Sequence, residues 1–343
     1  MQSTAPRVQI PFSPLNKVLG SVAEWFKVHV WKTCVQFPAP RVQIPSLPIF
    51  QEHQMHVRNV IKTLDDYWSS LGFSLVPSYD IPIGAATFHP LTFIKSVLKS
   101  PCRIAFSQRC RRPSDSIPSK LDQAMHLSSF TQYQVIFTDS NSKDHPHNVL
   151  ELYEGSLVAL GVNLLTCDFK YVEDHWNSPS LCAFGRGWEV ALNGLEITQI
   201  TDFDRFAGID KCRISEIAYG VERIAMSLSG CSYADLQWDD LTSFQDMYGF
   251  EEAEYQKLSS NPLFDKTSVQ KDLDSRVDLV RRALNSELFY GAYDQFCLLN
   301  YQFNLASANV GAFDHSLYAK YMKEMQILSC ELASLLTSKH RGD

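Results

Sequence analysis

The stretch Trp188-Glu-Val-Ala-Leu-Asn193-Gly194-Leu-Glu-Ile-Thr-Gln-Ile200 decides the fold, because Asn-Gly between two β-prone runs is a strong signal for a two-residue hairpin turn. Pairing Leu192 with Leu195 would fix the strand register. Strand alternation then predicts one face that carries Glu189, Ala191, Glu196 and Thr198, with Gln199 on the opposite face. Two carboxylates on one diagonal, roughly 7–8 Å apart, would suit a cationic group or a metal-bound phosphate.

A strand, a glycine turn and a helix are predicted in Ser215-Glu-Ile-Ala-Tyr-Gly220-Val-Glu-Arg223-Ile-Ala-Met-Ser-Leu228. Glu216 lies in the strand, and the apolar residues after Gly220 recur at helical spacing. Arg223 falls in the first helical turn, where a cation opposes the helix dipole. This small cost indicates a guanidinium that serves a ligand, whereas the motif taken alone would equally suit a surface salt bridge.

Positive charge gathers between Lys95 and Arg112, a segment with six basic residues and no acidic one in a chain of net charge −7. A local positive field in an acidic protein indicates a phosphate-bearing ligand. The alternative is a solvated basic loop. Within this segment Arg111 or Arg112 is the candidate contact to an α-phosphate.

A strand, a loop and a second strand are predicted around these arginines, over residues 103–108, 109–113 and 130–137. The second strand alternates, so that Gln132 and Gln134 share one side of the sheet.

Taken together, these segments resemble a known family. Residues 103–137 look like motif 2 of the class II aminoacyl-tRNA synthetases, and residues 215–226 look like motif 3. The stretches 173–176 and 187–199 resemble the α subunit of the bacterial heterotetrameric glycyl-tRNA synthetase. The resemblance is divergent and runs from about residue 58 to about residue 305. It includes Leu64-Asp-Asp-Tyr-Trp68, Gly72, Gly84-Ala-Ala-Thr-Phe-His-Pro90, Arg111-Arg-Pro113, Gln132-Tyr-Gln134 and Glu151-Leu-Tyr-Glu-Gly-Ser-Leu157.

This resemblance implies an α+β fold, in which the antiparallel sheet of class II synthetases is flanked by helices and followed by a C-terminal helical domain. It implies that glycine is activated with ATP and Mg²⁺ to glycyl-adenylate and transferred to tRNA-Gly together with a β subunit. It also implies a homodimer of α chains within an α2β2 assembly and no membrane partner. Catalysis of this kind is positioning plus charge neutralisation.

The resemblance also assigns roles, residue by residue. It places an arginine on each side of the triphosphate, namely Arg223 and either Arg111 or Arg112. Glu196 would hold magnesium and ATP, and Glu216 would anchor the ammonium of the amino acid. The remaining substrate-binding candidates are Glu189, Gln199, Gln132 and Gln134. Since hairpin parity separates Glu189 from Gln199, one of these two is expected to be structural.

Two departures from the family favour other readings. Residues 115–126 lack the arginines and glycines that usually follow Arg-Arg-Pro, and Lys120 and His126 do not offer the bidentate fork of arginine. Ala191 and Phe184 stand where larger aromatic residues are usual, which predicts a reshaped amino-acid pocket. One alternative is therefore a non-catalytic, synthetase-like binding protein that has lost ATP chemistry. Another is a ligase for a different small amino acid or amine.

Composition limits where in the cell the chain is expected to lie. The 343 residues are 45% hydrophobic without any run of eighteen apolar residues, so no membrane span is expected. Nine cysteines without a C-x-x-C pair indicate reduced thiols and argue against a zinc ribbon. The expected location is cytoplasmic, or an organellar matrix if the N-terminal segment is a transit peptide.

Three domains are expected along the chain. The N-terminal segment repeats Ala-Pro-Arg-Val-Gln-Ile-Pro at 5–11 and 39–45, which two copies cannot build into a solenoid. Apolar residues at helical spacing among charged ones predict helices near the C-terminus, over 269–284, 286–305 and 316–336. The predicted domains are a disordered or targeting extension, a class II catalytic domain and a helical domain, at 1–55, 56–240 and 241–343.

Overall fold

A computed structural model describes residues 55–115, 126–138, 149–257, 265–308 and 313–341. From Gln54 onward the chain forms one compact unit. The repeated N-terminal heptapeptide and most of the altered loop, residues 116–125, lie outside the described residues. The domain boundary at 240/241 stays a prediction.

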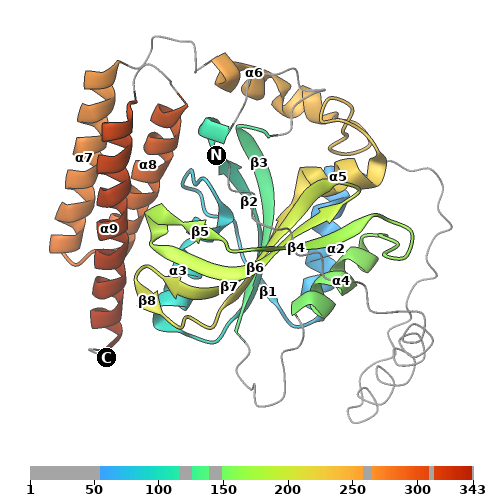
Figure 1. Cartoon of the computed structure of the whole chain (residues 1–343), viewed down its shortest axis with the longest axis horizontal. Helices are drawn as coiled ribbons and strands as arrows, with labels where there is room; N and C mark the ends of the chain where they lie inside the picture. Colours follow the sequence, from blue (N-terminus) through green and yellow to red (C-terminus); the bar gives the residue numbers. More distant parts are fainter. Residues whose placement is uncertain (1–54, 116–125, 139–148, 258–264, 309–312, 342–343) are drawn as a thin grey trace, which may run out of the picture. The chain divides into compact units, whose positions relative to one another are not determined.

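A nine-stranded sheet forms the centre of the unit, in the order β1-β2-β3-β9-β7-β6-β4, with β5 paired to β6 and β8 to β7 (Figure 1). Every pairing is antiparallel except that of β1 with β2, which is parallel. The strands are β1 Ser74–Leu75, β2 Arg103–Arg111, β3 Ser129–Phe137, β4 Phe169–Asp174, β5 Asn177–Ser178, β6 Ala183–Leu192, β7 Leu195–Phe206, β8 Ile209–Asp210 and β9 Ser215–Gly220. The α+β class predicted from the sequence is confirmed.

The β6–β7 hairpin turns where the sequence predicted, with Leu192 opposite Leu195. Asn193 and Gly194 both have positive φ, 52° and 83°, as a type I′ turn requires. The predicted parity is wrong beyond the turn, because a β-bulge leaves Ile197 without a partner between the pairs Ala191–Glu196 and Val190–Thr198.

The bulge reverses two face assignments. Thr198 turns to the helix-covered face, where Tyr153 Oη donates to Thr198 Oγ1 at 2.9 Å. Gln199 pairs with Glu189 and so shares its face. The expectation that parity separates Glu189 from Gln199 is therefore wrong, since a count of alternating residues cannot register an inserted residue.

One face of the sheet is covered by helices α2, α4 and α5, at Val57–Ser70, Val149–Ala159 and Val221–Ser229. Helix α2 shows why: Val57, Val60, Leu64 and Trp68 recur at helical spacing and are fully buried. Each such side chain stabilises the fold by roughly 1.5–3 kcal/mol relative to an exposed one. This core contains Tyr133 and Tyr219 of the sheet.

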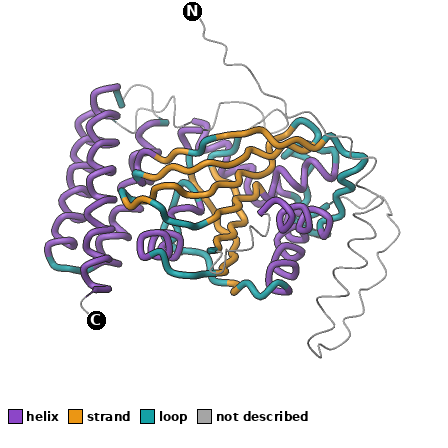
Figure 2. The backbone as a smooth tube through the Cα atoms, turned by 60° about the horizontal axis from the view of Figure 1, so that its bottom comes forward, coloured by secondary structure: helices purple, strands orange, loops and turns teal. Residues whose placement is uncertain are grey.

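A second core joins the other side of the sheet to the C-terminal helices. These are α7 Lys266–Asn285, α8 Phe289–Ser307 and α9 His315–Arg341, which lie side by side (Figures 1 and 2). Helix α7 begins at Asp265, whose carboxylate accepts from the backbone N–H groups of Thr267 and Ser268. The three predicted helices are thus confirmed; α7 and α9 are longer than predicted, and α8 begins three residues later than predicted and ends two residues later.

The strand that leads into the basic loop is longer than predicted. β2 continues to Arg111, because Arg111 still pairs with Ser129 of β3. The loop therefore begins at Arg112, which is followed directly by the short helical turn η3 at Pro113–Asp115. No described helix is long and apolar enough to cross a bilayer.

Close contact between β6 and β7 requires glycine at position 187. A Cβ added there would lie 1.9 Å from the carbonyl oxygen of Ile200. We expect Gly187→Ala to lower the free energy of unfolding by about 2–3 kcal/mol, because the strands must move apart. Urea-induced unfolding measures the change.

Gly291→Ala is the matched control. A Cβ at Gly291 would make an ordinary 3.6 Å contact with Leu288 in helix α8, so alanine should raise stability by up to about 1 kcal/mol. Equal stabilities of the two variants would contradict the close strand contact at Gly187.

Candidate active site

Polar side chains from four neighbouring strands meet on the face of the sheet that α2, α4 and α5 leave open. Directly opposite residues share a face, so the strand registers define two rows across the sheet. One row is Glu189, Gln199, Ala218 and Gln134, and the next is Gly187, Thr201, Glu216 and Ile136. The sequence predicted Glu189, Glu216, Gln134 and Gln199 as site residues, and the structure brings them onto one surface.

A cavity of about 270 Å³ opens at the end of this surface where β2 and β3 connect. It holds five of the predicted residues, namely Arg112, Gln132, Glu196, Gln199 and Arg223. Its other lining residues are His126, Leu127, Phe130, Ile197, Thr198, Ala218, Gly220, Glu222 and Tyr233. A concave site with a few convergent charged groups is the ordinary form of a small-molecule site.

Arg223 reaches from helix α5 across to the hairpin. Its Nη1 donates to Glu196 Oε2 at 3.0 Å and to the Glu196 carbonyl oxygen at 3.1 Å. Its Nη2 lies 3.1 Å from His126 Nδ1. Burial lowers the pKa of Arg223, but Tyr233 and Glu196 outweigh it and raise that pKa overall. The guanidinium is therefore charged and held in the cavity.

The two candidate arginines, Arg111 and Arg112, point to different places in the structure. Arg112 lines the cavity, with its guanidinium carbon 5.2 Å from the Phe130 ring centroid. Arg111 instead pairs with Glu251 at 2.9 Å and donates to Tyr255 Oη at 2.8 Å, and both partners belong to helix α6, Phe250–Gln256. Strand alternation explains the difference, because Arg111 follows the face of Arg109 and Arg112 follows that of Gln108.

Glu216 is fully buried on β9. Thr87 Oγ1, from the short helix η2 at Ala86–Phe88, donates to Glu216 Oε1 at 2.8 Å. Within the described residues Glu216 Oε2 has no hydrogen-bond partner, and neither do Gln134 Oε1, Gln134 Nε2 and Thr201 Oγ1. Burial raises the pKa of Glu216 to about 8, against the lowering effect of the hydrogen bond from Thr87. Buried unsatisfied groups gathered in one place indicate where a ligand is received.

The sequence profile of the glycyl-tRNA synthetase alpha subunit matches residues 57–341. The chain belongs to this family. It is thus an aminoacyl-tRNA synthetase chain, and its family uses ATP. The resemblance read from motifs 2 and 3 is confirmed, and the match extends through all three C-terminal helices, beyond the predicted end near residue 305.

Solved structures of other synthetases are similar only at a distance. Two are pyrrolysyl-tRNA synthetases from Desulfitobacterium hafniense, at 14% and 15% identity and TM-scores of 0.37, covering 63% and 65% of this chain and 78% and 84% of theirs. A third is the aspartyl-tRNA synthetase from Entamoeba histolytica, at 10% identity and a TM-score of 0.36, covering 61% of this chain and 64% of that one. TM-scores below 0.5 support no argument about function.

The carboxylates of this synthetase site fit a magnesium ion that arrives with a nucleotide. The described residues contain no group of three or more His, Cys, Asp or Glu side chains suited to a metal. Mg²⁺ commonly uses one or two carboxylates together with substrate phosphates. Glu196 lines the cavity, where it is paired with Arg223. Burial, together with Glu196 and Asp174, raises the pKa of nearby Glu189. Bound Mg²⁺ would neutralise phosphate charge there.

Some residues at the site were not singled out from the sequence. Thr87 lies within the quoted stretch 84–90, but its bond to Glu216 spans 129 positions. Thr201 gave no signal, because only strand pairing sets it opposite Glu216. Phe184, predicted to reshape the pocket, lies at the far end of β6, where it is 43% exposed beneath Arg205.

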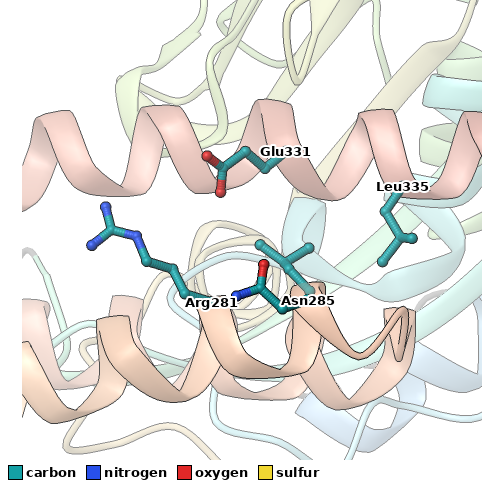
Figure 3. Close-up of a pocket in the computed structure, with 5 residues that line it drawn as sticks. Arg281, Asn285, Glu331 and Leu335 are labelled. Carbon is teal, nitrogen blue, oxygen red and sulfur yellow. The ribbon is translucent and has the colours of Figure 1, made fainter.

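A separate cavity of about 310 Å³ lies between helices α7 and α9 (Figure 3). It is lined by Arg281, Leu284, Asn285, Glu331 and Leu335. Arg281 donates to Glu324 of α9, and no predicted site residue lines this cavity. It is a feature of the helical bundle and not of the synthetase site.

Glu216 should make stability depend on pH. Its pKa is about 8 in the folded chain and about 4.5 when unfolded, so its contribution is fully present below pH 4.5 and is lost as the pH rises towards 8. The slope is up to about 1.4 kcal/mol per pH unit. Glu216→Gln lacks this loss, so its stability relative to the unsubstituted chain should rise between pH 5.5 and 7.5. Urea unfolding of both proteins at both pH values measures it, and a constant difference would contradict a protonated Glu216.

Proposed function

We propose that this chain is the α subunit of a glycine-tRNA ligase, which activates glycine with ATP to glycyl-adenylate. In this proposal the glycyl group then passes to tRNA-Gly together with a β subunit. The observation that carries the proposal is the arrangement of two arginines, Arg112 and Arg223, around a cavity on the same face of the sheet as the buried carboxyl of Glu216.

The chemical step is attack of the glycine carboxylate on the α-phosphorus of ATP. A new carboxyl–phosphate bond forms, and the bond to the leaving pyrophosphate breaks. The protein has to hold the two reactants in line and offset charge on the phosphate oxygens. Arg112, stacked on Phe130, is suited to the α-phosphate, and Arg223 to the nucleotide.

The remaining roles follow from position. Glu196 would hold magnesium in place of its present ion pair with Arg223. Glu216 receives the ammonium of glycine, with Gln134 and Thr201 supplying hydrogen bonds that are unused within the described structure. Glu189, Gln199 and Gln132 complete the polar surface.

The partners in this proposal are glycine, tRNA-Gly, ATP with Mg²⁺ and a β subunit. The assembly is a homodimer of α chains within α2β2. The family's name, alpha subunit, supports a second subunit. The cytoplasmic location predicted from the cysteines is part of the same proposal.

Glycine-dependent ATP–pyrophosphate exchange tests the proposal. The purified chain, alone and with its β subunit, should exchange pyrophosphate with glycine and far less with alanine or serine. Exchange favouring another amino acid would support the alternative ligase. Absence of exchange with all three, from the folded chain with its β subunit, would support the synthetase-like binding protein.

Arg112 and Arg111 offer a matched pair of variants. Arg112→Ala should lower glycine-dependent exchange at least about tenfold, because a charge-assisted contact to phosphate contributes 1.4 kcal/mol or more. Arg111→Ala should change exchange by less than about threefold, because it removes a partly exposed ion pair outside the cavity. Steady-state exchange rates decide, and a larger loss for Arg111→Ala would reverse the assignment.

A further inference from the structure

The carboxyl of Glu216 is enclosed without a positive charge beside it. Its side chain is fully buried. The bond from Thr87 to Oε1 is neutral, and Oε2 has no hydrogen-bond partner among the described residues. None of the ion pairs found in the described structure includes Glu216. If this carboxyl were ionised, neither an opposite charge nor enough hydrogen bonds would offset the free energy lost on removing it from water.

The titratable groups on the elements around Glu216 are directed elsewhere. They are His89 after η2, which lies against Pro77 O; Tyr133 on β3, which donates to Asp65; Asp202 on β7, which accepts from Ser215; and Tyr219 on β9, which bonds Ser156. Burial is the largest influence on the pKa of Glu216, opposed only by the hydrogen bond from Thr87 and by the nearby amide of Gln134. No charged neighbour offsets the burial.

Two polar groups beside Glu216 complete the enclosure. Gln134 is fully buried, and both atoms of its amide lack hydrogen-bond partners within the described residues. Thr201, directly opposite Glu216 on β7, has an unpartnered hydroxyl. An amide oxygen, a hydroxyl and a carboxyl oxygen together match the three N–H donors of an ammonium group.

We propose that Glu216 carries a proton in the free chain and loses it to solvent when a substrate ammonium binds, so that amino-acid binding releases one proton. This inference rests on the proposed function. The O–H bond of the carboxyl breaks, the proton passes to water or buffer, and the ammonium keeps all its protons. The resulting carboxylate–ammonium pair is neutral overall, as the empty site was.

Protonation of Glu216 avoids burying a charge in the site when no ligand is bound. A neutral carboxyl costs far less to bury than a carboxylate, so the site stays folded without a ligand. Glu216 becomes a charged carboxylate only when the ammonium group of a ligand binds beside it. A ligand of the same shape without the ammonium leaves the proton on Glu216 and gains no ion pair, which makes the protonation change a means of selecting amines.

Affinity then depends on pH in a defined direction. When one proton leaves on binding, the dissociation constant falls about tenfold for each unit by which the pH rises, as long as the pH stays below the pKa of the free carboxyl. Between pH 5.5 and 7, affinity for an ammonium-bearing ligand should therefore rise by more than tenfold. Affinity for its amine-free counterpart should stay nearly constant.

Calorimetry with two adenylate analogues tests the inference. The full chain with its β subunit is titrated at pH 6.5 with glycyl-sulfamoyl-adenosine and with acetyl-sulfamoyl-adenosine, which lacks only the amine. Each titration is repeated in phosphate and in Tris, whose ionisation enthalpies differ. The heat difference between buffers counts the protons released. We expect close to one proton for the glycyl analogue and none for the acetyl analogue.

The outcomes separate the inference from the proposed function. Binding of the glycyl analogue with less than half a proton released overturns the inference and leaves the function standing. Failure of both analogues to bind overturns both. Glu216→Gln, which cannot ionise, should bind either analogue without proton release. The pH dependence of the unsubstituted chain's affinity gives the same answer if that variant does not fold.

Discussion

The pairing of β6 with β7 is the constraint on which the site depends. Its turn needs two residues of positive φ, which Asn193 and Gly194 supply. The bulge at Ile197, one of two irregularities in this pairing, then brings Gln199 beside Glu189 while Glu196 keeps its place opposite Ala191. Because side chains alternate along a strand, one inserted residue changes the face of everything that follows. Without that insertion, Gln199 would lie on the opposite face from Glu189 and Glu196.

Acidic side chains hold in place the arginines at the cavity and next to it. Glu196 fixes Arg223, and Glu251 accepts from Arg109 and pairs with Arg111. Buried Glu222 lies 3.6 Å from Arg109 and accepts from the backbone N–H of Thr131. A chain of net charge −7 can present a cationic site in this way, because carboxylates orient Arg109, Arg111 and Arg223. Arg112 and Arg223 line the cavity itself.

The C-terminal helices belong to the same structure as the sheet. Ser329 of α9 donates to the carbonyl of Leu181 at 2.9 Å, and Tyr293 of α8 donates to that of Phe88. The second contact lies next to η2, which carries Thr87 and so the hydrogen bond to Glu216. The helical region thereby supports the part of the site around Glu216 through packing.

The sequence by itself determined the family, the hairpin turn, the order of strand, turn and helix around Glu216, and the helices of the C-terminal region. Local sequence patterns indicate these features, for example a dipeptide that favours positive φ or apolar residues at helical spacing. Only the tertiary structure decided that Gln199 faces the site, that Arg112 and not Arg111 lines the cavity, and that Thr87 and Thr201 adjoin Glu216. These facts depend on a bulge, on where β2 ends, and on pairings between residues far apart in the chain, and no local pattern encodes them.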